Sequence, residues 1–558
     1  MKKKITSTYF FTVFKIVLFC FIGNNLCFAQ EGFTNFGNLA IHPQGNVGTI
    51  VPFVNSNAEV GDYLNNGDFF TTSNFTNNKL AMPAGSGNTT FNGTAATPQL
   101  IAGGDTSRFY NLIINNNNPM GGVRIDRTIG IQNEFNLSAA SKLSLNTGDI
   151  ILRSTAARTA YITNLGTTGP SPNISYGSGL FNIERYLQAV KSWRLLATPI
   201  QNDGLSIRNS WQEGGSTTST GYGTQITGPI VSGTGMDQYT QRGSMMWFDT
   251  TTNKYVVIGN TTDPIARPQG YYVFVRGDRA QNVGGPGGVT TLRMRGRILT
   301  GDQTFIAPRR TGPTNGFQSV GNPYPSQISY QTVEKMNLEP TFTIWNPSGG
   351  VYGVGRFIQY ISTTGLNGVY SNGVTPMNTI ESGQAFFIQS TSGGSGRIII
   401  KETDKLSGSN LVSRNAGENR LGVTDPTLQV NLHDAGGNTT PTFLDYVVLN
   451  FDSSYSNDFD GNDVRKFMNA NDNLAIKNGS FNLILERRRT LQANDTIFLS
   501  LTSTRVAPYR FEIDPSVLGN LALEAFLKDN FLQTETPVSL TDVTNVNFNI
   551  TSDAASRA

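Results

Sequence analysis

Residues 110–118 read YNLIINNNN, a short apolar strand followed by a polar corner. Tyr110, Leu112 and Ile114 fall on every second position, which is the period of a β-strand, and the asparagines then form a turn. The period of two continues in the pairs Val123/Ile125, Ile129/Ile131, Phe135/Leu137, Leu143/Leu145 and Ile150/Leu152. Such closely spaced strands are typical of the stacked rungs of a β-helix or β-solenoid, although a flattened sandwich also fits this degenerate repeat. We therefore predict β-helix or solenoid-like rungs over residues 30–154.

The next region, residues 155–401, is predicted to be an aromatic- and Gly-rich β domain. It contains all four tryptophans and strand-like runs at 271–275 and 397–400, and Gly-rich turns separate its strands. A polar stretch, residues 402–420, is predicted to be a linker.

Residues 421–558 show the cleanest alternation and are predicted to form a β-sandwich, with one short helix over Leu521 to Lys528. Its strands are read from the alternating sets Leu428/Val430/Leu432, Leu483/Leu485, Ile497/Leu499/Leu501, Tyr509/Phe511/Ile513 and Val546/Phe548/Ile550. The fold class expected for the whole chain is all-β.

Composition supports a folded β protein. Glycine accounts for 60 of the 558 residues, and 10% of the residues are aromatic, as expected for many turns and half-buried strands. Only 15% of the residues are charged, so charge-driven disorder is not expected.

Residues 1–29 are predicted to be a signal peptide. Three lysines follow Met1, the stretch from Phe10 to Ile22 is mostly apolar, and Cys27-Phe28-Ala29 provides a cleavage site. The apolar stretch is shorter than the ~20 residues of a membrane span, and neither cysteine follows the small residue that a lipobox requires.

Removal of this segment takes away four lysines and both cysteines, leaving 38 basic and 39 acidic residues. A chain with that balance has no electrostatic case for nucleic acid, and without cysteine it has no disulfide or thiolate chemistry. No later stretch is apolar enough to span a bilayer. We expect a protein that is secreted or attached to the outer cell surface.

Several blocks resemble secreted multidomain proteins of the Bacteroidota, many of which are type IX secretion substrates. The blocks are Phe91-Asn92-Gly93-Thr94, residues 109–116, residues 193–199, residues 270–278, residues 321–325, residues 380–387, Thr536-Pro537-Val538 and residues 551–556. The resemblance implies an adhesin-like surface architecture and export by the Sec and type IX machinery. In that group the segment Asp553-Ala554-Ala555 leads into a last strand and often a sorting domain, so we expect the sandwich to be incomplete at Ala558.

Catalytic motifs are scarce. The two histidines, His42 and His433, are far apart in sequence, and the only approach to a nucleophile elbow, around Ser395, ends in Arg397 instead of glycine. A serine triad or a zinc site is therefore not expected. We predict no catalytic, cofactor-binding or metal-binding residues and no cofactor.

Acidic residues offer two weaker candidates. A β-helix lyase would need clustered acids on successive rungs, whereas the acids of the first region are scattered. Residues 458–463, DFDGND, could wrap Ca²⁺ but are more typical of an Asp/Asn/Gly turn. The scattered acids are Glu59, Asp62, Asp68, Asp105, Asp126, Glu134 and Asp149.

Four recognition motifs remain. Arg276-Gly277-Asp278 follows a strand and is expected in a tight exposed turn, and Arg487 to Arg489 are expected at a solvated strand end. Trp193, Trp211, Trp247 and Trp345 could include a sugar-stacking platform, although core positions are commoner for tryptophan. Two segments, 249–251 and 495–497, resemble the O-glycosylation sequon of the same bacterial group.

These observations favour an exported, non-enzymatic structural or adhesin-like surface protein that presents loops on a β scaffold. The alternative is a glycan-binding or glycan-cleaving module, similar to a β-helix lyase, used in polysaccharide foraging. The expected partners are the export machinery and either glycans or other surface proteins, without nucleic acid.

Overall fold

The computed structural model describes residues 32–557 except 57–61, 167–172, 202–204, 229–232, 240–242, 282–286, 313–314, 348–355, 362–378, 410–425, 437–440, 461–462, 468–471, 516–517 and 519–520. The predicted signal peptide lies outside these residues. Within them the secondary structure is β-strand apart from three short 3-10 turns, η2 (Glu213–Gly215), η3 (Glu402–Asp404) and η4 (Ala554–Arg557). The all-β prediction is confirmed. In the described part of the chain, none of the helices could cross a bilayer.

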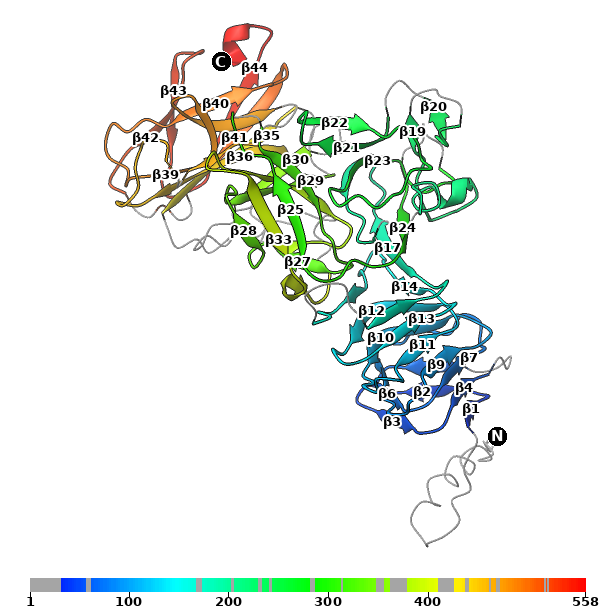
Figure 1. Ribbon diagram of the computed structural model, residues 1–558. Coiled ribbons are helices and arrows are strands. Elements are labelled where there is room, and N and C mark those ends of the chain that lie inside the picture. Colours follow the sequence, from blue (N-terminus) through cyan, green and yellow to red (C-terminus); the bar gives the residue numbers. More distant parts are fainter. Residues whose placement is uncertain are drawn as a thin grey trace, which may run out of the picture.

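The N-terminal region is a β-solenoid of about five turns, as predicted, and it forms the lower right of Figure 1. One parallel sheet contains β1 (Phe33–Asn35), β4 (Phe53–Asn55), β7 (Phe75–Asn77), β9 (Gln99–Ala102), β11 (Val123–Ile125), β13 (Leu143–Leu145) and β16 (Ile174–Tyr176). The other contains β3 (Asn46–Thr49), β6 (Asp68–Thr71), β8 (Asn88–Phe91), β10 (Ser107–Ile114), β12 (Ile129–Leu137), β14 (Ile150–Leu152) and β17 (Phe181–Leu187), with β15 (Tyr161–Ile162) beside β12. A parallel pair, β2 (Leu39–Ile41) and β5 (Tyr63–Asn65), completes the early rungs.

The first rungs are held by repeated aromatic and asparagine positions. Phe53 and Phe75 occupy the same place in successive strands, are fully buried, and have ring centroids 5.1 Å apart. The asparagines two residues later form a buried ladder, in which Asn35 Nδ2 donates to Asn55 Oδ1 at 3.0 Å and Asn55 Nδ2 donates to Asn77 Oδ1 at 2.9 Å. Each amide therefore satisfies the next, which lets polar side chains lie inside the solenoid.

The register of β10 differs from the sequence pattern at one residue. A bulge between Phe109 and Asn111 shifts the pairing with β12, so that Phe109 enters the core while Tyr110 faces outward. Tyr110 is consequently not on the same face as Leu112 and Ile114, contrary to the prediction. Phe109 pairs with Ile131 and Asn111 with Glu134, so the extra residue lies on β12 and a period-two count along β10 alone does not reveal it.

The solenoid extends beyond the predicted boundary at 154 and ends at β17. There the strand order changes, because β17 pairs antiparallel with β24 (Thr290–Gly296). A cap then packs on the last rung, and many of its apolar residues belong to the same continuous core as the solenoid, from Ile41 to Ile298. The cap contains the sheet β18 (Ser192–Leu196), β23 (Tyr271–Val275), β21 (Met245–Asp249) and β22 (Lys254–Val257), and the pair β19 (Thr227–Gly228) and β20 (Gln238–Tyr239).

The second half of the middle region has a core of its own, built around buried residues such as Tyr324, Tyr330 and Phe386. Its sheets are β25 (Gln303–Ala307), β33 (Gly396–Ile400) and β28 (Glu334–Met336); β26 (Phe317–Gly321), β32 (Ala385–Gln389), β29 (Thr341–Asn346) and β30 (Arg356–Ile361); and β31 (Thr379–Ile380), β27 (Gln327–Ser329) and β34 (Lys405–Leu406). The start of the expected linker belongs to this unit, since Glu402 is buried and accepts hydrogen bonds from the backbone N–H groups of Leu165 and Gly301.

The C-terminal region is built on one large sheet, ordered β40 (Phe498–Thr502), β38 (Asn473–Asn478), β39 (Phe481–Arg488), β36 (Thr442–Phe451), β35 (Thr427–Asp434), β41 (Ala507–Asp514) and β44 (Thr544–Ile550), with β37 (Val464–Arg465) beside β39. A smaller layer, the hairpin β42 (Ala525–Asp529) and β43 (Thr534–Val538), packs Leu527 and Val538 on its core. The predicted helix over Leu521 to Lys528 is wrong, because Ala525 to Asp529 pair with β43 as an extended strand.

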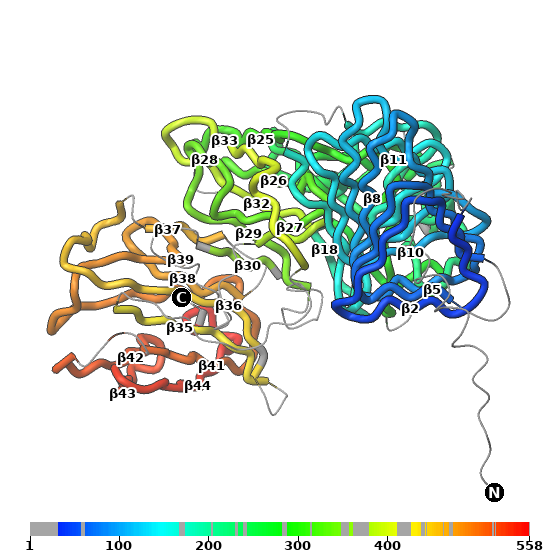
Figure 2. The backbone as a smooth tube through the Cα atoms, turned by 90° about the horizontal axis from the view of Figure 1, so that it is seen from below, coloured from blue at the N-terminus to red at the C-terminus, as the bar shows by residue number. Residues whose placement is uncertain are grey.

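An aromatic cluster joins the cap, the second half of the middle region and the C-terminal region. Phe467, which follows β37, packs against Phe317, Phe357 and Phe387 with ring centroids 5.0, 5.0 and 5.9 Å away. Tyr446 in the C-terminal sheet also donates a hydrogen bond to the Gln359 carbonyl at 2.8 Å. Figure 2 shows the C-terminal layers beside β29 and β30, on the far side from the solenoid.

Candidate functional site

The candidate site is a pocket of about 300 Å³ on the outer face of the solenoid, where the cap overhangs it. It is lined by Arg108 of β10, Gly130 and Gln132 of β12, Arg153 after β14, and Tyr222 of the cap. Arg108 and Gly130 are direct neighbours across the parallel ladder. A Cβ at Gly130 would lie 3.4 Å from Arg153 Nε and 3.9 Å from Arg108 Cγ, so the two arginines extend over the bare backbone from either side.

The charges around the pocket are only partly balanced. Arg153 Nη1 donates to Glu184 Oε1 at 2.8 Å, and burial raises the pKa of this carboxyl while the arginine opposes the rise. Arg293 pairs with Glu213, and its guanidinium lies 3.8 Å from the centre of the Tyr222 ring. Arg108 has no hydrogen bond or ion pair within the described residues, which leaves one guanidinium free to bind an acceptor.

The polar surface continues along the neighbouring rungs. The Tyr161 hydroxyl donates to Glu134 Oε2 at 2.6 Å, and burial together with this carboxylate raises the pKa of Tyr161. The Arg158 guanidinium covers the Tyr110 ring at 4.8 Å. Aromatic faces beside guanidinium and amide donors suit ligands with both C–H faces and hydroxyl or acidic groups.

The pocket can bind, but its lining offers little for acid–base chemistry. None of its five lining residues carries a carboxyl group, and the nearby Glu184 is already held by Arg153. Glycoside hydrolysis requires two carboxyl groups facing one space. The described residues also contain no group of three or more His, Cys, Asp or Glu side chains that could hold a metal.

The Arg-Gly-Asp tripeptide is not in an exposed turn, contrary to the prediction. Asp278 is 6% exposed, and its carboxylate accepts from the backbone N–H groups of Gly221 and Ala280. The Asp278 carboxylate is not available to a receptor, because it holds the loop around Gly221 in place through a hydrogen bond. Recognition of the tripeptide by a receptor would need that loop to open.

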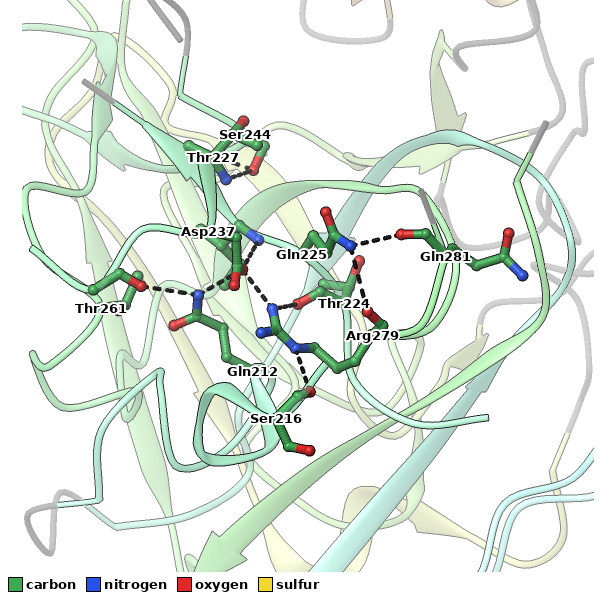
Figure 3. A network of polar contacts seen from close by, with 12 residues as sticks. Gln212, Ser216, Thr224, Gln225, Thr227, Asp237, Ser244, Thr261, Arg279 and Gln281 are labelled. Carbon is green, nitrogen blue, oxygen red and sulfur yellow. Dashed lines mark hydrogen bonds and ion pairs between the residues drawn. The ribbon is translucent and has the colours of Figure 1, made fainter. Parts of the chain in front are cut away.

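The adjacent Arg279 organises the polar network in Figure 3. It is 1% exposed, forms an ion pair with Asp237, and donates to the carbonyls of Ser216 and Thr224. Asp237 also accepts from Gln212 Nε2 at 2.7 Å. These bonds tie together cap segments that are poor in regular strands, so we assign the network a structural role.

The candidate calcium loop is a turn where it is described. Asp463 Oδ2 accepts from the Asp460 N–H at 3.0 Å and Oδ1 from the Arg487 N–H at 2.9 Å, so both oxygens serve the backbone. Burial raises the pKa of Asp463 to about 6. Gly461 and Asn462 lie outside the described residues.

The remaining candidates are dispersed. His42 is exposed in a solenoid turn, whereas His433 lies half-buried against Phe443 in the C-terminal sheet. The four tryptophans do not form one platform: Trp211 is buried, Trp193 and Trp345 belong to the aromatic cluster, and Trp247 lies under Arg267. The arginine run is not fully solvated, because Arg488 is buried beside Glu486.

The solenoid acids are occupied locally. Asp68 accepts from Asn88, Asp126 pairs with Arg124 and Asp149 pairs with Arg295; Glu59 lies outside the described residues. In the two sequon-like segments Thr250 is half-buried and Thr496 is exposed.

The pocket residues were not predicted from the sequence. Arg108 and Arg153 each lie one position from a core residue, Phe109 and Leu152, which places them on the outer face of nearby rungs. That pattern could have indicated a basic stripe. Nothing in the sequence indicates that Tyr222 packs over it.

No protein-family model, no curated protein and no solved structure matches this chain. The resemblance to secreted Bacteroidota proteins thus stays a prediction from the sequence blocks.

Proposed function

We propose that this chain is an exported, non-enzymatic, adhesin-like protein of the cell surface that holds a glycan or a glycosylated partner against its solenoid. The observation that carries the proposal is the pocket under the cap, with an unpaired Arg108, the Gln132 amide and the Tyr222 ring on a wall without carboxyl groups. Export by Sec and type IX machinery is part of the proposal and rests on the leader and the sequence blocks.

The scaffold supports a binding role. Backbone hydrogen bonds and a continuous apolar core hold β10, β12 and β14, so the pocket residues need little reordering to meet a ligand. Guanidinium, amide and phenol groups can donate hydrogen bonds to the hydroxyl and acidic groups of sugars.

The second candidate is a glycan-cleaving module, and the solenoid itself is the observation that favours it. The two are separated by incubating the purified protein with an array of neutral and acidic polysaccharides, then assaying bound protein and released sugar ends. Binding without release supports the adhesin-like function. Release of new sugar ends that is abolished by loss of Arg153 or Tyr161 would establish an enzyme. If the protein neither binds nor cleaves any of the polysaccharides, both proposals are contradicted.

A further inference from the structure

A second, smaller pocket lies where the cap meets the second core, and it contains more positive than negative charge. The pocket has a volume of about 30 Å³, and its lining includes Arg185, Arg194, Gln188, Gln384 and Trp345. Both arginines are almost completely buried, at 4% and 6% exposure. Burying a charge without a counter-charge is costly, so such a pocket needs an explanation.

Arg185 forms an ion pair with Glu381. The Glu381 carboxylate lies 3.7 Å from Arg185 Nη1, and Ser409 donates a further hydrogen bond to it. Within the described residues, this acid is paired with Arg185, and Arg194 forms no ion pair of its own.

Among the residues that the structure describes, none supplies a counter-charge to Arg194. Its Nη2 donates to the Val190 carbonyl at 3.1 Å, and its buried Nε has no partner. The charged group that acts on it is Arg185, so burial and this repulsion lower the pKa of Arg194 to about 10. Trp345 lines the same pocket, and its indole N–H is also buried without a partner.

We propose that this pocket binds a small monovalent anion of carboxylate or halide size, held by Arg194 and the Trp345 indole N–H with Arg185 behind them. The anion would neutralise the excess charge and accept the two orphaned hydrogen bonds. A space of this volume admits only a few heavy atoms, which excludes a large polyanion from the interior. The site spans both units, because Arg194 lies on β18 of the cap and Trp345 on β29 of the second core. The inference does not depend on the proposed function of the larger pocket.

Isothermal titration calorimetry on the purified protein, at constant ionic strength in a buffer of large organic anions, tests the site with three probes: sodium acetate, sodium chloride and sodium glucuronate. Saturable binding of acetate or chloride indicates a free ion as the occupant. Binding of glucuronate alone indicates the carboxylate of a larger ligand. No uptake of any of the three overturns the proposal.

Two variants locate the binding. Arg194→Gln should weaken anion binding at least tenfold, whereas Arg309→Gln, at an exposed position, should leave it unchanged. Trp345→Phe keeps the ring but removes the N–H, and should weaken binding several-fold even if the arginine variant does not fold. Equal anion affinity in wild type and Trp345→Phe, together with equal affinity in a folded Arg194→Gln, would contradict the assignment.

Discussion

Arg108 and Arg153 lie on either side of Gly130, yet they differ in what holds them. Arg153 is fixed by Glu184, whereas Arg108 has no partner among the described side chains. A paired guanidinium offers only its remaining N–H groups to a ligand, while an unpaired one brings its whole charge. Arg108 should therefore contribute most of the pocket's affinity for an acidic ligand.

Arg108→Gln is expected to lower affinity for acidic glycans about tenfold and affinity for neutral glycans much less, because the change removes charge and keeps a hydrogen-bond donor. Affinities from surface plasmon resonance at two salt concentrations would measure both effects. Arg309→Gln is the matched control. Unchanged affinity of the Arg108 variant for every glycan would exclude the pocket as the binding site.

Asp463 predicts a pH dependence of stability. Its pKa is about 6 in the folded protein, against about 3.9 in an unfolded chain, so the folded state holds more protons between these values. The stability supplied by this group is thus complete below about pH 4 and is lost as the pH rises to about 6.

Asp463→Asn removes this titration, and the difference in unfolding free energy between wild type and variant should change by about 2 kcal/mol from pH 4 to pH 7. Urea unfolding at several pH values measures it. The exposed Asp458→Asn is the control. A constant difference across this range would contradict the buried titration.

At the scale of single elements, the solenoid rungs depend on their asparagines. Asn55 is 1% exposed and is the middle member of the ladder, accepting from Asn35 and donating to Asn77. Its removal leaves one buried donor and one buried acceptor without this partner.

Asn55→Ala should lower the free energy of unfolding by about 2 kcal/mol, which urea denaturation followed by circular dichroism can measure. The exposed Asn115→Ala should change it by less than about 0.5 kcal/mol. Equal effects in the two variants would show that the ladder contributes no stability of its own.

The sequence was sufficient to predict the all-β class and many of the strands, but not how the elements pack against one another. Alternation identified the strands of the solenoid and the C-terminal sheet because one face of each is buried. The bulge at Tyr110 and the strand in place of the 521–528 helix depend on pairing partners that a local pattern does not contain. Asp278 was expected to be exposed, since turn composition does not reveal that Gly221 packs on it. Both pockets lie at contacts between segments distant in sequence, which explains why their residues were missed.

At the scale of the whole molecule, Phe467 secures the C-terminal region to the second core. Its ring contacts three phenylalanines on strands of that unit, Phe317, Phe357 and Phe387. Since the contacts come from one half-buried side chain, the junction should be sensitive to a single truncation.

Phe467→Ala should weaken this junction by about 2 kcal/mol and increase the maximum dimension of the protein in small-angle X-ray scattering. The exposed Phe498→Ala should leave the scattering profile unchanged. A variant with an unaltered profile and unaltered hydrogen exchange around β30 would indicate that the polar contacts of Gln359 suffice.

The stacked rungs also have a consequence for evolution. Each turn of the solenoid contacts only the turns next to it, so a coil can be duplicated or deleted without redesigning the rest of the protein. Each such event would move the cap by one strand spacing, about 4.8 Å, nearer to or farther from the N-terminal end. Selection could adjust the length of the solenoid in steps of that size while the pocket under the cap and the units that follow it stay unchanged.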